Sequence, residues 1–294
     1  MWVVGYLSLD DIVVDGRLHR EVPGGAALYA ALGAAAGGAA VVLVAARGLD
    51  FPESVLEGLR RAGIDVSAVA PRDHPSRRAR LDHGPDGRRD SAHYGQADWH
   101  AATEALVPPL PPPTAPPPAA AVLTAMPAAE LGRQLDRASA RGAVVVADTS
   151  EVFARRDREP LLALAERLAL FAPSREETRL LLPGLDDEAA LAALARRCPR
   201  VVQKRGADGL ALVSAAHPTG LRVPAVAGPV VDPTGAGDAC VGALGAGLAR
   251  GLDDPALLAL GREVASRAVA GLGPSGLGLA GTAAGNRPAP VADR

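Results

Sequence analysis

The chain has 294 residues, of which 48% are hydrophobic but only 3% aromatic, so we expect a core built mainly from Ala, Val and Leu. The formal net charge of −2 argues against a nucleic-acid-binding protein. The two cysteines, Cys198 and Cys240, lack the C-x-x-C spacing of a zinc or redox site. We find no signal peptide and no uninterrupted apolar run of about 18 residues. We therefore expect a cytoplasmic protein of one large or two small α/β domains, without a membrane span.

Apolar, β-rich runs alternate along the chain with helical patterns. The expected strands are residues 2–7, 41–45, 120–124, 143–147, 169–172, 201–204, 210–213 and 221–231. The expected helices are residues 26–32, 52–62, 128–141, 161–168 and 255–272, and one that follows the last strand and runs to Leu248. This alternation predicts a mainly parallel sheet covered by helices on both faces.

Three further segments stand outside this alternation. Residues 12–17 have the pattern of a hairpin strand and turn. Residues 77–94 are predicted to form a polar two-stranded ribbon, and they contain Arg77, Arg78, Arg80, Arg88 and Arg89. Residues 108–118 are mostly proline and predict a stiff polyproline-II spacer that returns the chain to the core, with an SH3-type ligand as the alternative.

The stretch Asp232-Pro-Thr-Gly-Ala-Gly-Asp238 predicts a glycine-rich turn that opens a helix. Such a turn directs several backbone N–H groups to one point, and the helix start adds partial positive charge. The result is a site for an anion such as a phosphate. A carboxylate at Asp238 can take a proton from an alcohol there, whereas the simpler alternative is an aspartate that caps the helix.

Other polar residues are expected at strand ends, where ligands of open α/β sheets gather. Asp10, placed by the pattern at the end of the first strand, can accept hydrogen bonds from sugar hydroxyls, or can simply cap a turn. Gly24 and Gly25 allow a backbone to approach a ligand closely, or merely start a helix. Lys204, followed by Gly206 and Gly209, suits ATP phosphates, with an exposed hairpin lysine as the alternative.

The motifs of several other enzyme classes are absent. The chain contains no G-x-x-x-x-G-K-[S/T], no H-R-D or D-F-G, and no G-x-S-x-G. Their absence argues against a P-loop NTPase, a protein kinase and an α/β-hydrolase. The G-x-G-x-x-G spelling at residues 271–276 follows a helix instead of a strand, so it does not predict a dinucleotide site.

In their order from Gly5 to Gly276, these motifs resemble those of the PfkB (ribokinase-like) family of small-molecule kinases. The family motif D-x-x-G-A-G-D matches residues 232–238, G-x-x-x-x-D matches residues 5–10, and the N-terminal glycine pair matches Gly24 and Gly25. The chain departs from the family at three places. The N-x-x-E motif has Ser174 in place of Asn, T-x-G-x-x-G begins with Lys204, and residues 26–29 lack the usual Asn.

The resemblance implies a three-layer α/β/α sandwich with a mainly parallel central sheet and a small β lid. It implies a kinase domain at residues 1–280, lid segments at about residues 9–20 and 76–98, and a flexible tail at 281–294. The activity implied is an ATP-dependent transfer of the γ-phosphoryl group to a hydroxyl of a sugar, sugar acid or cyclitol. Two alternatives remain open: a nucleoside kinase, which the few aromatic residues disfavour, and a binding protein that has lost turnover.

The resemblance also implies roles for individual residues. Asp238 is the expected general base, and the amides of Gly235, Ala236 and Gly237 would stabilise the transferred group. The expected ATP contacts are Lys204, Gly206, Gly209, Thr234 and Gly273. The expected acceptor contacts are Asp10, Gly24, Gly25 and Arg80. Glu177, whose alternative role is that of a surface glutamate at a helix start, would help to hold Mg²⁺. A monovalent cation such as K⁺ and a homodimer formed through the lid edges are further expectations.

Overall fold

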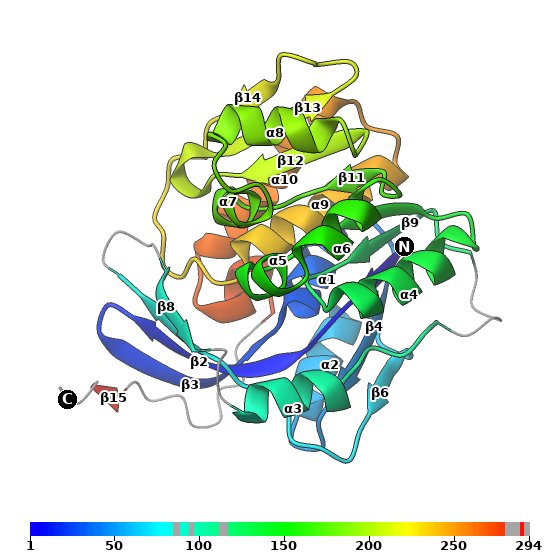
Figure 1. Ribbon diagram of the computed structural model, residues 1–294. Helices are drawn as coiled ribbons and strands as arrows, with labels where there is room; N and C mark the ends of the chain where they lie inside the picture. Colours follow the sequence, from blue (N-terminus) through cyan, green and yellow to red (C-terminus); the bar gives the residue numbers. More distant parts are fainter. Residues whose placement is uncertain (85–88, 94–96, 112–116, 280–288, 291–294) are drawn as a thin grey trace.

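The computed structural model describes residues 1–84, 89–93, 97–111, 117–279 and 289–290 (Figure 1). A large sheet runs through the molecule. Its strands, in spatial order, are β14 (Leu221–Val223), β13 (Leu210–Ser214), β12 (Arg200–Lys204), β11 (Leu170–Phe171), β10 (Val144–Ala147), β9 (Ala120–Leu123), β1 (Trp2–Val4), β4 (Val41–Arg47) and β5 (Ile64–Asp65), and β6 (Val69–Pro71) also pairs with β4. Strands β12 to β5 are parallel, and β13 and β14 are antiparallel additions, which confirms the predicted mainly parallel sheet.

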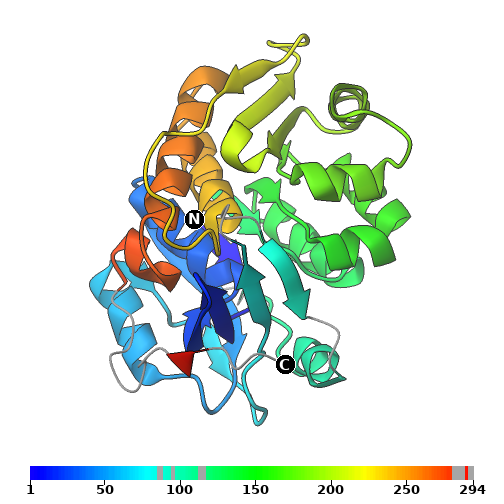
Figure 2. The same cartoon turned by 90° about the vertical axis from the view of Figure 1, so that its left-hand side faces the viewer.

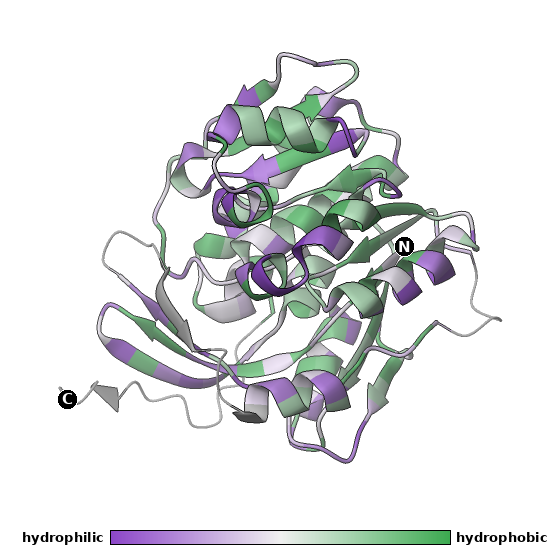
Figure 3. Cartoon of the chain, in the orientation of Figure 1, coloured by the Kyte–Doolittle hydropathy of each residue, from purple (hydrophilic) through white to green (hydrophobic). Residues whose placement is uncertain are grey.

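Helices cover both faces of this sheet because successive strand residues point to opposite sides. Val3 packs into one apolar core, whereas Trp2 and Val4 pack into the other. The first core is closed by α1 (Ala26–Ala36), α2 (Glu53–Arg61), α9 (Ala236–Ala249) and α10 (Asp254–Val269). The second is closed by α3 (Ala97–Ala105), α4 (Ala128–Ser139), α5 (Glu151–Arg156), α6 (Arg158–Ala165), α7 (Arg175–Leu181) and α8 (Asp187–Ala195). Figure 3 shows the apolar strands inside and polar residues on the outer helices, so the predicted three-layer sandwich is confirmed.

A second sheet contains, in order, β15 (Ala289–Pro290), β3 (Arg17–Gly24), β2 (Ser8–Val14), β7 (Arg80–His83) and β8 (Arg89–His93). Strands β2 and β3 form a hairpin whose turn, Asp15 and Gly16, has φ values of 50° and 69°, as a type I′ turn requires. Strand β7 pairs in parallel with β2, and β8 pairs with β7 (Figure 2). The predicted hairpin and polar ribbon therefore meet in one sheet, although residues 85–88 and 94–96 lie outside the described part of the chain.

Two strand predictions are wrong in their extent. The strand predicted at 221–231 ends at Val223, because Pro224 and Pro229 interrupt the run; Val226 and Val230 are 45% and 55% exposed. The first strand ends at Val4, so Asp10 lies within β2 of the second sheet and not at the end of the first strand. The apolar pattern alone does not distinguish a paired strand from an extended segment.

The remaining predicted segments are placed as follows. The predicted helices correspond to α1, α2, α4, α6, α9 and α10, with ends that differ by a few residues. Helices α3, α5 and α8 are not predicted by the sequence patterns.

The start of the proline-rich segment packs on α4, as a spacer would, because the Arg137 guanidinium donates to the Pro111 carbonyl at 2.9 Å. Residues 112–116 lie outside the described residues. Most of the predicted tail is also outside them, and no helix in the described ranges is long and apolar enough to cross a membrane.

Glycines let helices α1 and α9 approach each other closely. A Cβ atom on Gly33 would lie 2.1 Å from the Ala239 carbonyl oxygen, and one on Gly242 would lie 2.0 Å from that of Ala30. Both distances are far below contact distance, so a side chain at either position would force the helices apart. This packing fixes the start of α9, which carries the predicted anion-binding turn.

We expect Gly242→Ala to lower the free energy of unfolding by about 1–3 kcal/mol, since the added methyl group overpacks the α1–α9 contact. Gly132→Ala is the matched control, because Gly132 also lies inside a helix but its added Cβ would meet only Leu164, at 3.6 Å. The control should be neutral or more stable by up to about 1 kcal/mol, through helix propensity. Chemical denaturation measures both, and equal effects would contradict this account of the packing.

Candidate active site

Three adjacent parallel strands deliver polar residues to one edge of the large sheet. Asp148 follows β10, Ser174 follows β11, and Lys204 ends β12. The last two are neighbours, since the Lys204 amide donates to the Pro173 carbonyl at 2.9 Å. The carboxyl ends of parallel strands are the usual ligand-binding edge of an open α/β sheet.

The Lys204 ammonium group lies 2.5 Å from a carboxylate oxygen of Asp148, and the two side chains are only 12% and 3% exposed. Burial alone would lower the pKa of Lys204, but the carboxylates of Asp148, Glu177 and Asp238 outweigh it and raise the pKa above its usual range. Burial raises the pKa of Asp148, against the attraction of Lys204. The site therefore holds a protonated lysine. Asp148 was not predicted, because its partner is 56 residues away in the sequence.

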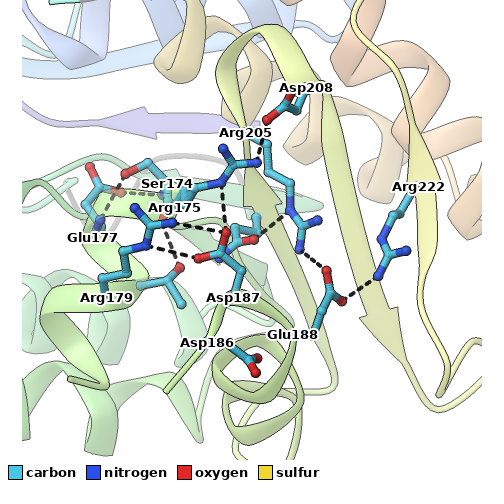
Figure 4. Close-up of polar contacts among 12 residues, drawn as sticks. Ser174, Arg175, Glu177, Arg179, Asp186, Asp187, Glu188, Arg205, Asp208 and Arg222 are labelled. Atoms are coloured by element: carbon cyan, nitrogen blue, oxygen red, sulfur yellow. Dashed lines mark hydrogen bonds and ion pairs between the residues drawn. The ribbon is translucent and has the colours of Figure 1, made fainter. Parts of the chain in front are cut away.

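Glu177 lies beside this pair at the start of α7. Its carboxylate accepts from the Ser174 amide at 2.6 Å, while the Ser174 hydroxyl accepts from the Glu177 amide at 3.1 Å, a capping box (Figure 4). Burial, with Lys204 opposing and Asp148 adding to it, raises the pKa of Glu177 to about 8. Glu177 does start a helix, but it is buried among charges instead of lying on the surface. Ser174, in place of the family Asn, caps the helix.

Ion pairs surround the capping box and connect α7 and α8 to the turn after Lys204 (Figure 4). Arg175 contacts Asp187 at 3.0 Å and Asp208 at 2.8 Å, and Asp208 belongs to the short 3₁₀ turn Gly206–Asp208. Gly206 and Gly209 have φ values of 57° and 84° there. The two glycines predicted to contact ATP thus shape a turn held against α7, and their contact with ATP stays a prediction.

The predicted glycine-rich turn leads into α9 as expected, with Gly235 as the N-cap in the left-handed conformation at φ 75°. Residues 233–238 are half-buried. A Cβ on Gly237 would lie 3.5–3.6 Å from the end of the Lys204 side chain. Lys204, Gly237 and Asp238 therefore converge at the N-terminus of α9, and Asp238 lies within the first turn of the helix instead of capping it.

Asp232 anchors this turn to the chain after α10. One carboxylate oxygen accepts from the Thr234 amide at 2.9 Å, and the other accepts from the Gly273 amide at 2.7 Å. Gly273, at φ 54°, begins the 3₁₀ turn Gly273–Leu277. The structure thus brings Thr234 and Gly273, both predicted ATP contacts, to the same buried carboxylate.

The predicted acceptor residues also come together. Asp10 is buried in β2, where it accepts from the Ser8 hydroxyl at 2.8 Å and the Ala79 amide at 3.0 Å, and burial raises its pKa to about 6. A Cβ on Gly24 would lie 2.4 Å from a carboxylate oxygen of Asp10. Gly25, at φ 92°, begins α1 beside Gly24. Asp10 is therefore a buried carboxyl group next to the glycine pair.

Tyr29 lies between the acceptor residues and the turn. A Cβ on Gly235 would lie 2.2–2.4 Å from atoms of the Tyr29 ring, so this ring packs directly on the turn. The buried Tyr29 hydroxyl has no hydrogen-bond partner among the described residues. Burial, followed by the charges of Asp232, Asp10 and Asp238, raises its pKa well above the usual value. Tyr29 belongs to residues 26–29, the segment that lacks the family Asn. The charges of Asp10, the predicted acceptor contact, and of Asp238, in the turn, both act on its hydroxyl group.

The arginines of the ribbon are placed differently from one another. Arg80 is 44% exposed and pairs with Asp82 at 3.1 Å, so its contact with the acceptor stays a prediction. Arg77 is buried, with its guanidinium 4.2 Å from the ring centre of Tyr6 and 4.7 Å from that of Trp99.

Within the described residues, no group of three or more His, Cys, Asp or Glu side chains could hold a metal ion. A contact between Glu177 and Mg²⁺ stays a prediction.

Comparisons with known proteins match most of the chain to one family. Residues 8–277 match the family described as pfkB family carbohydrate kinase. A cytidine kinase from Thermococcus kodakarensis is 27% identical over 266 residues, which cover 89% of this chain and 92% of the relative.

Solved structures share the fold at lower identity. Adenosine kinase from Sinorhizobium meliloti has a TM-score of 0.75 and 19% identity, with 93% of this chain and 94% of that chain covered. Aminoimidazole riboside kinase from Salmonella enterica, complexed with aminoimidazole riboside and an ATP analogue, has a TM-score of 0.70 and 23% identity, with 95% of each chain covered. The sandwich and the second sheet are thus those of ribokinase-like kinases.

The pKa of Glu177 leads to a test of the buried charges in the protein without nucleotide. Because this pKa is raised from 4.5 to about 8, the folded protein binds the proton more tightly than the unfolded chain does. Its contribution to stability is complete below about pH 4.5 and is lost as the pH rises through 8. We expect Glu177→Gln, which keeps an oxygen for the Ser174 amide, to lose less thermal stability than the parent chain between pH 5 and pH 8.

Glu176→Gln is the matched control, because Glu176 is the exposed neighbour of Glu177 on the same helix. Its melting temperature should follow the pH dependence of the parent protein. Parallel pH profiles for the parent and Glu177→Gln would show that the Glu177 carboxyl is not held in its protonated form.

Proposed function

We propose that this chain, which belongs to the pfkB family of carbohydrate kinases and is a phosphotransferase, transfers the γ-phosphoryl group of ATP to a hydroxyl of a small polyhydroxylated acceptor. The acceptor class is a sugar, sugar acid or cyclitol. Family membership supports the phosphoryl transfer. The nucleotide, the acceptor and the role of each residue are our proposals.

One observation carries this proposal: the glycine-rich turn at the start of α9 lies against the buried Lys204 at Gly237 and against the Tyr29 ring at Gly235. Lys204 lies against Gly237 on the phosphate side, and the charges of Asp10 and Asp238 both act on the Tyr29 hydroxyl. Phosphoryl transfer requires mainly positioning and neutralisation of charge. The arrangement supports both, since the turn and Lys204 are suited to phosphates and the buried Asp10 is suited to hydroxyl groups.

In the proposed reaction, the Asp238 carboxylate removes the proton from the acceptor hydroxyl, and the oxygen then bonds to the γ-phosphorus. The bond between that phosphorus and the oxygen bridging it to the β-phosphate breaks, and ADP leaves. The amides of Gly235, Ala236, Gly237 and Asp238 stabilise the negative charge on the transferring group. Lys204 neutralises the phosphates, and Asp148 holds the lysine in place.

Mg²⁺, when bound with the nucleotide, would supply further neutralisation of the phosphates. Glu177 fits an outer contact to the ion, because among the described residues one of its oxygens accepts from the Ser174 amide and the carboxyl group lies beside Lys204. A monovalent cation, a homodimer formed through the second sheet and a cytoplasmic location stay predictions.

A nucleoside is the second candidate acceptor. The observation that favours it is the cytidine kinase relative, which aligns over 89% of this chain. The few aromatic residues favour the polyhydroxylated acceptors, since a nucleobase is usually held by aromatic or other apolar side chains. The two candidates differ in the group that must be recognised beside the reacting hydroxyl.

A panel of sugars, sugar acids, cyclitols and nucleosides with ATP and Mg²⁺ tests these candidates. We expect an acceptor from the polyhydroxylated group to raise the melting temperature and to support ADP formation. Turnover with cytidine or another nucleoside alone would select the second candidate. Ligand binding without any turnover would indicate a binding protein that has lost its activity.

The variant Asp238→Asn tests the base. We expect kcat to fall by about 10²–10⁴-fold, because the amide cannot accept the proton, while ATP binding is retained. The control is Asp186→Asn, since Asp186 caps α8 through the Ala189 amide at 2.8 Å and Asn caps equally well. Near-normal turnover of Asp238→Asn would reduce this residue to a role at the helix start.

A further inference from the structure

A histidine of the second sheet reaches the turn that carries Asp238. The Nε2 atom of His83, the last residue of β7, lies 2.8 Å from the Thr234 hydroxyl oxygen, although the two residues are 151 positions apart. The same atom is 3.7 Å from a carboxylate oxygen of Asp232. The side chains of His83 and Asp232 are 4% and 0% exposed, so the contact is shielded from water.

The chemistry of the three groups gives the contact a direction. The negative charge of Asp232 favours the proton on Nε2, so that His83 donates to the Thr234 hydroxyl. The Thr234 amide donates in turn to the carboxylate oxygen of Asp232 that His83 faces, at 2.9 Å. His83 of the second sheet thus contacts both Thr234 and Asp232, which are also bonded to each other within the turn.

Buried polar contacts of this kind are costly to break, because each group that loses its partner stays away from water. Thr234 immediately precedes Gly235, the N-cap of α9, whose left-handed conformation sets the direction of the backbone that follows. A change in the backbone at Thr234 therefore moves the amides of residues 235–238. The second sheet also carries Asp10, on strand β2, which pairs with the strand of His83.

We propose that His83 is a positioning residue for phosphoryl transfer: it holds Thr234 and Asp232 so that the amides at the start of α9 and the Asp238 carboxylate are set only when the second sheet is in place. The inference rests on the proposed function. It adds that the strand beside the acceptor aspartate determines the geometry of the phosphate-binding turn.

The variants His83→Leu and His83→Gln test this role. Leu removes the donor at similar size, whereas Gln can place an amide N–H near the position of Nε2. We expect His83→Leu to lower kcat about 3- to 10-fold, with a smaller change in the acceptor KM, and His83→Gln to recover most of kcat. If Gln is as impaired as Leu, or if only the acceptor KM changes, the proposal is wrong.

A double-mutant cycle isolates the pair. Thr234→Val removes the hydroxyl but keeps the amide that Asp232 accepts from. In His83→Leu combined with Thr234→Val, we expect kcat to be no lower than in the worse single variant, because both changes remove the same contact. Fully multiplicative losses would show that the two residues act independently and would overturn the proposal. His19→Leu, on strand β3 of the same sheet and opposite Ile12, is the histidine control and should keep the parental kcat.

Amide hydrogen exchange in the nucleotide-free protein separates this inference from the proposed function. We expect the amides of residues 235–238 to exchange at least about 3-fold faster in His83→Leu than in the parent protein, His83→Gln or His19→Leu. Unchanged exchange would overturn the positioning role, even in an active enzyme. Faster exchange in a chain that phosphorylates no acceptor of the panel would support the contact and reject the proposed function alone.

Discussion

The organisation of this site depends on the burial of one ammonium group. A lysine that is almost enclosed by protein is stable as a cation only when carboxylates lie close to it. Asp148 fulfils this requirement from the end of β10, and Glu177 lies beside the pair at the start of α7. Because the same cation lies against Gly237, the charges that stabilise the fold also define where an anion can bind.

The second constraint is the close approach of the backbone around the glycines. Gly235 and Gly24 have no room for a side chain, since the Tyr29 ring covers the first and the Asp10 carboxyl covers the second. The glycine-rich turn is therefore packed on Tyr29, and the glycine pair is packed on Asp10. A substitution at Tyr29 or Asp10 would change the geometry of the turn or of the glycine pair as well as a direct contact.

The departures from the family motifs have structural explanations here. Ser174 replaces an asparagine, and its hydroxyl and amide complete the capping box that holds Glu177 at the buried start of α7. Tyr29 stands where the amide side chain is missing, and its buried hydroxyl lies near three aspartates.

Local patterns determined much of this protein in advance. The alternation of strands and helices predicted the parallel sheet, and the spacing of Asp232, Gly235, Gly237 and Asp238 predicted the turn at the start of α9. Those features depend on neighbouring residues, whose preferences can be read along the chain. The same reasoning failed for residues 224–231, because Pro224 and Pro229 interrupt the apolar run and the strand ends at Val223.

Only the tertiary structure decided which charged and polar groups meet. Asp148 and Lys204 are 56 residues apart, and His83 and Thr234 are 151 apart. Of Arg77, Arg78 and Arg80, Arg77 is the one buried between Tyr6 and Trp99. Such contacts depend on the order of strands in the two sheets and on burial, which strengthens an ion pair by removing water from it. Neither quantity is a property of any short stretch of sequence.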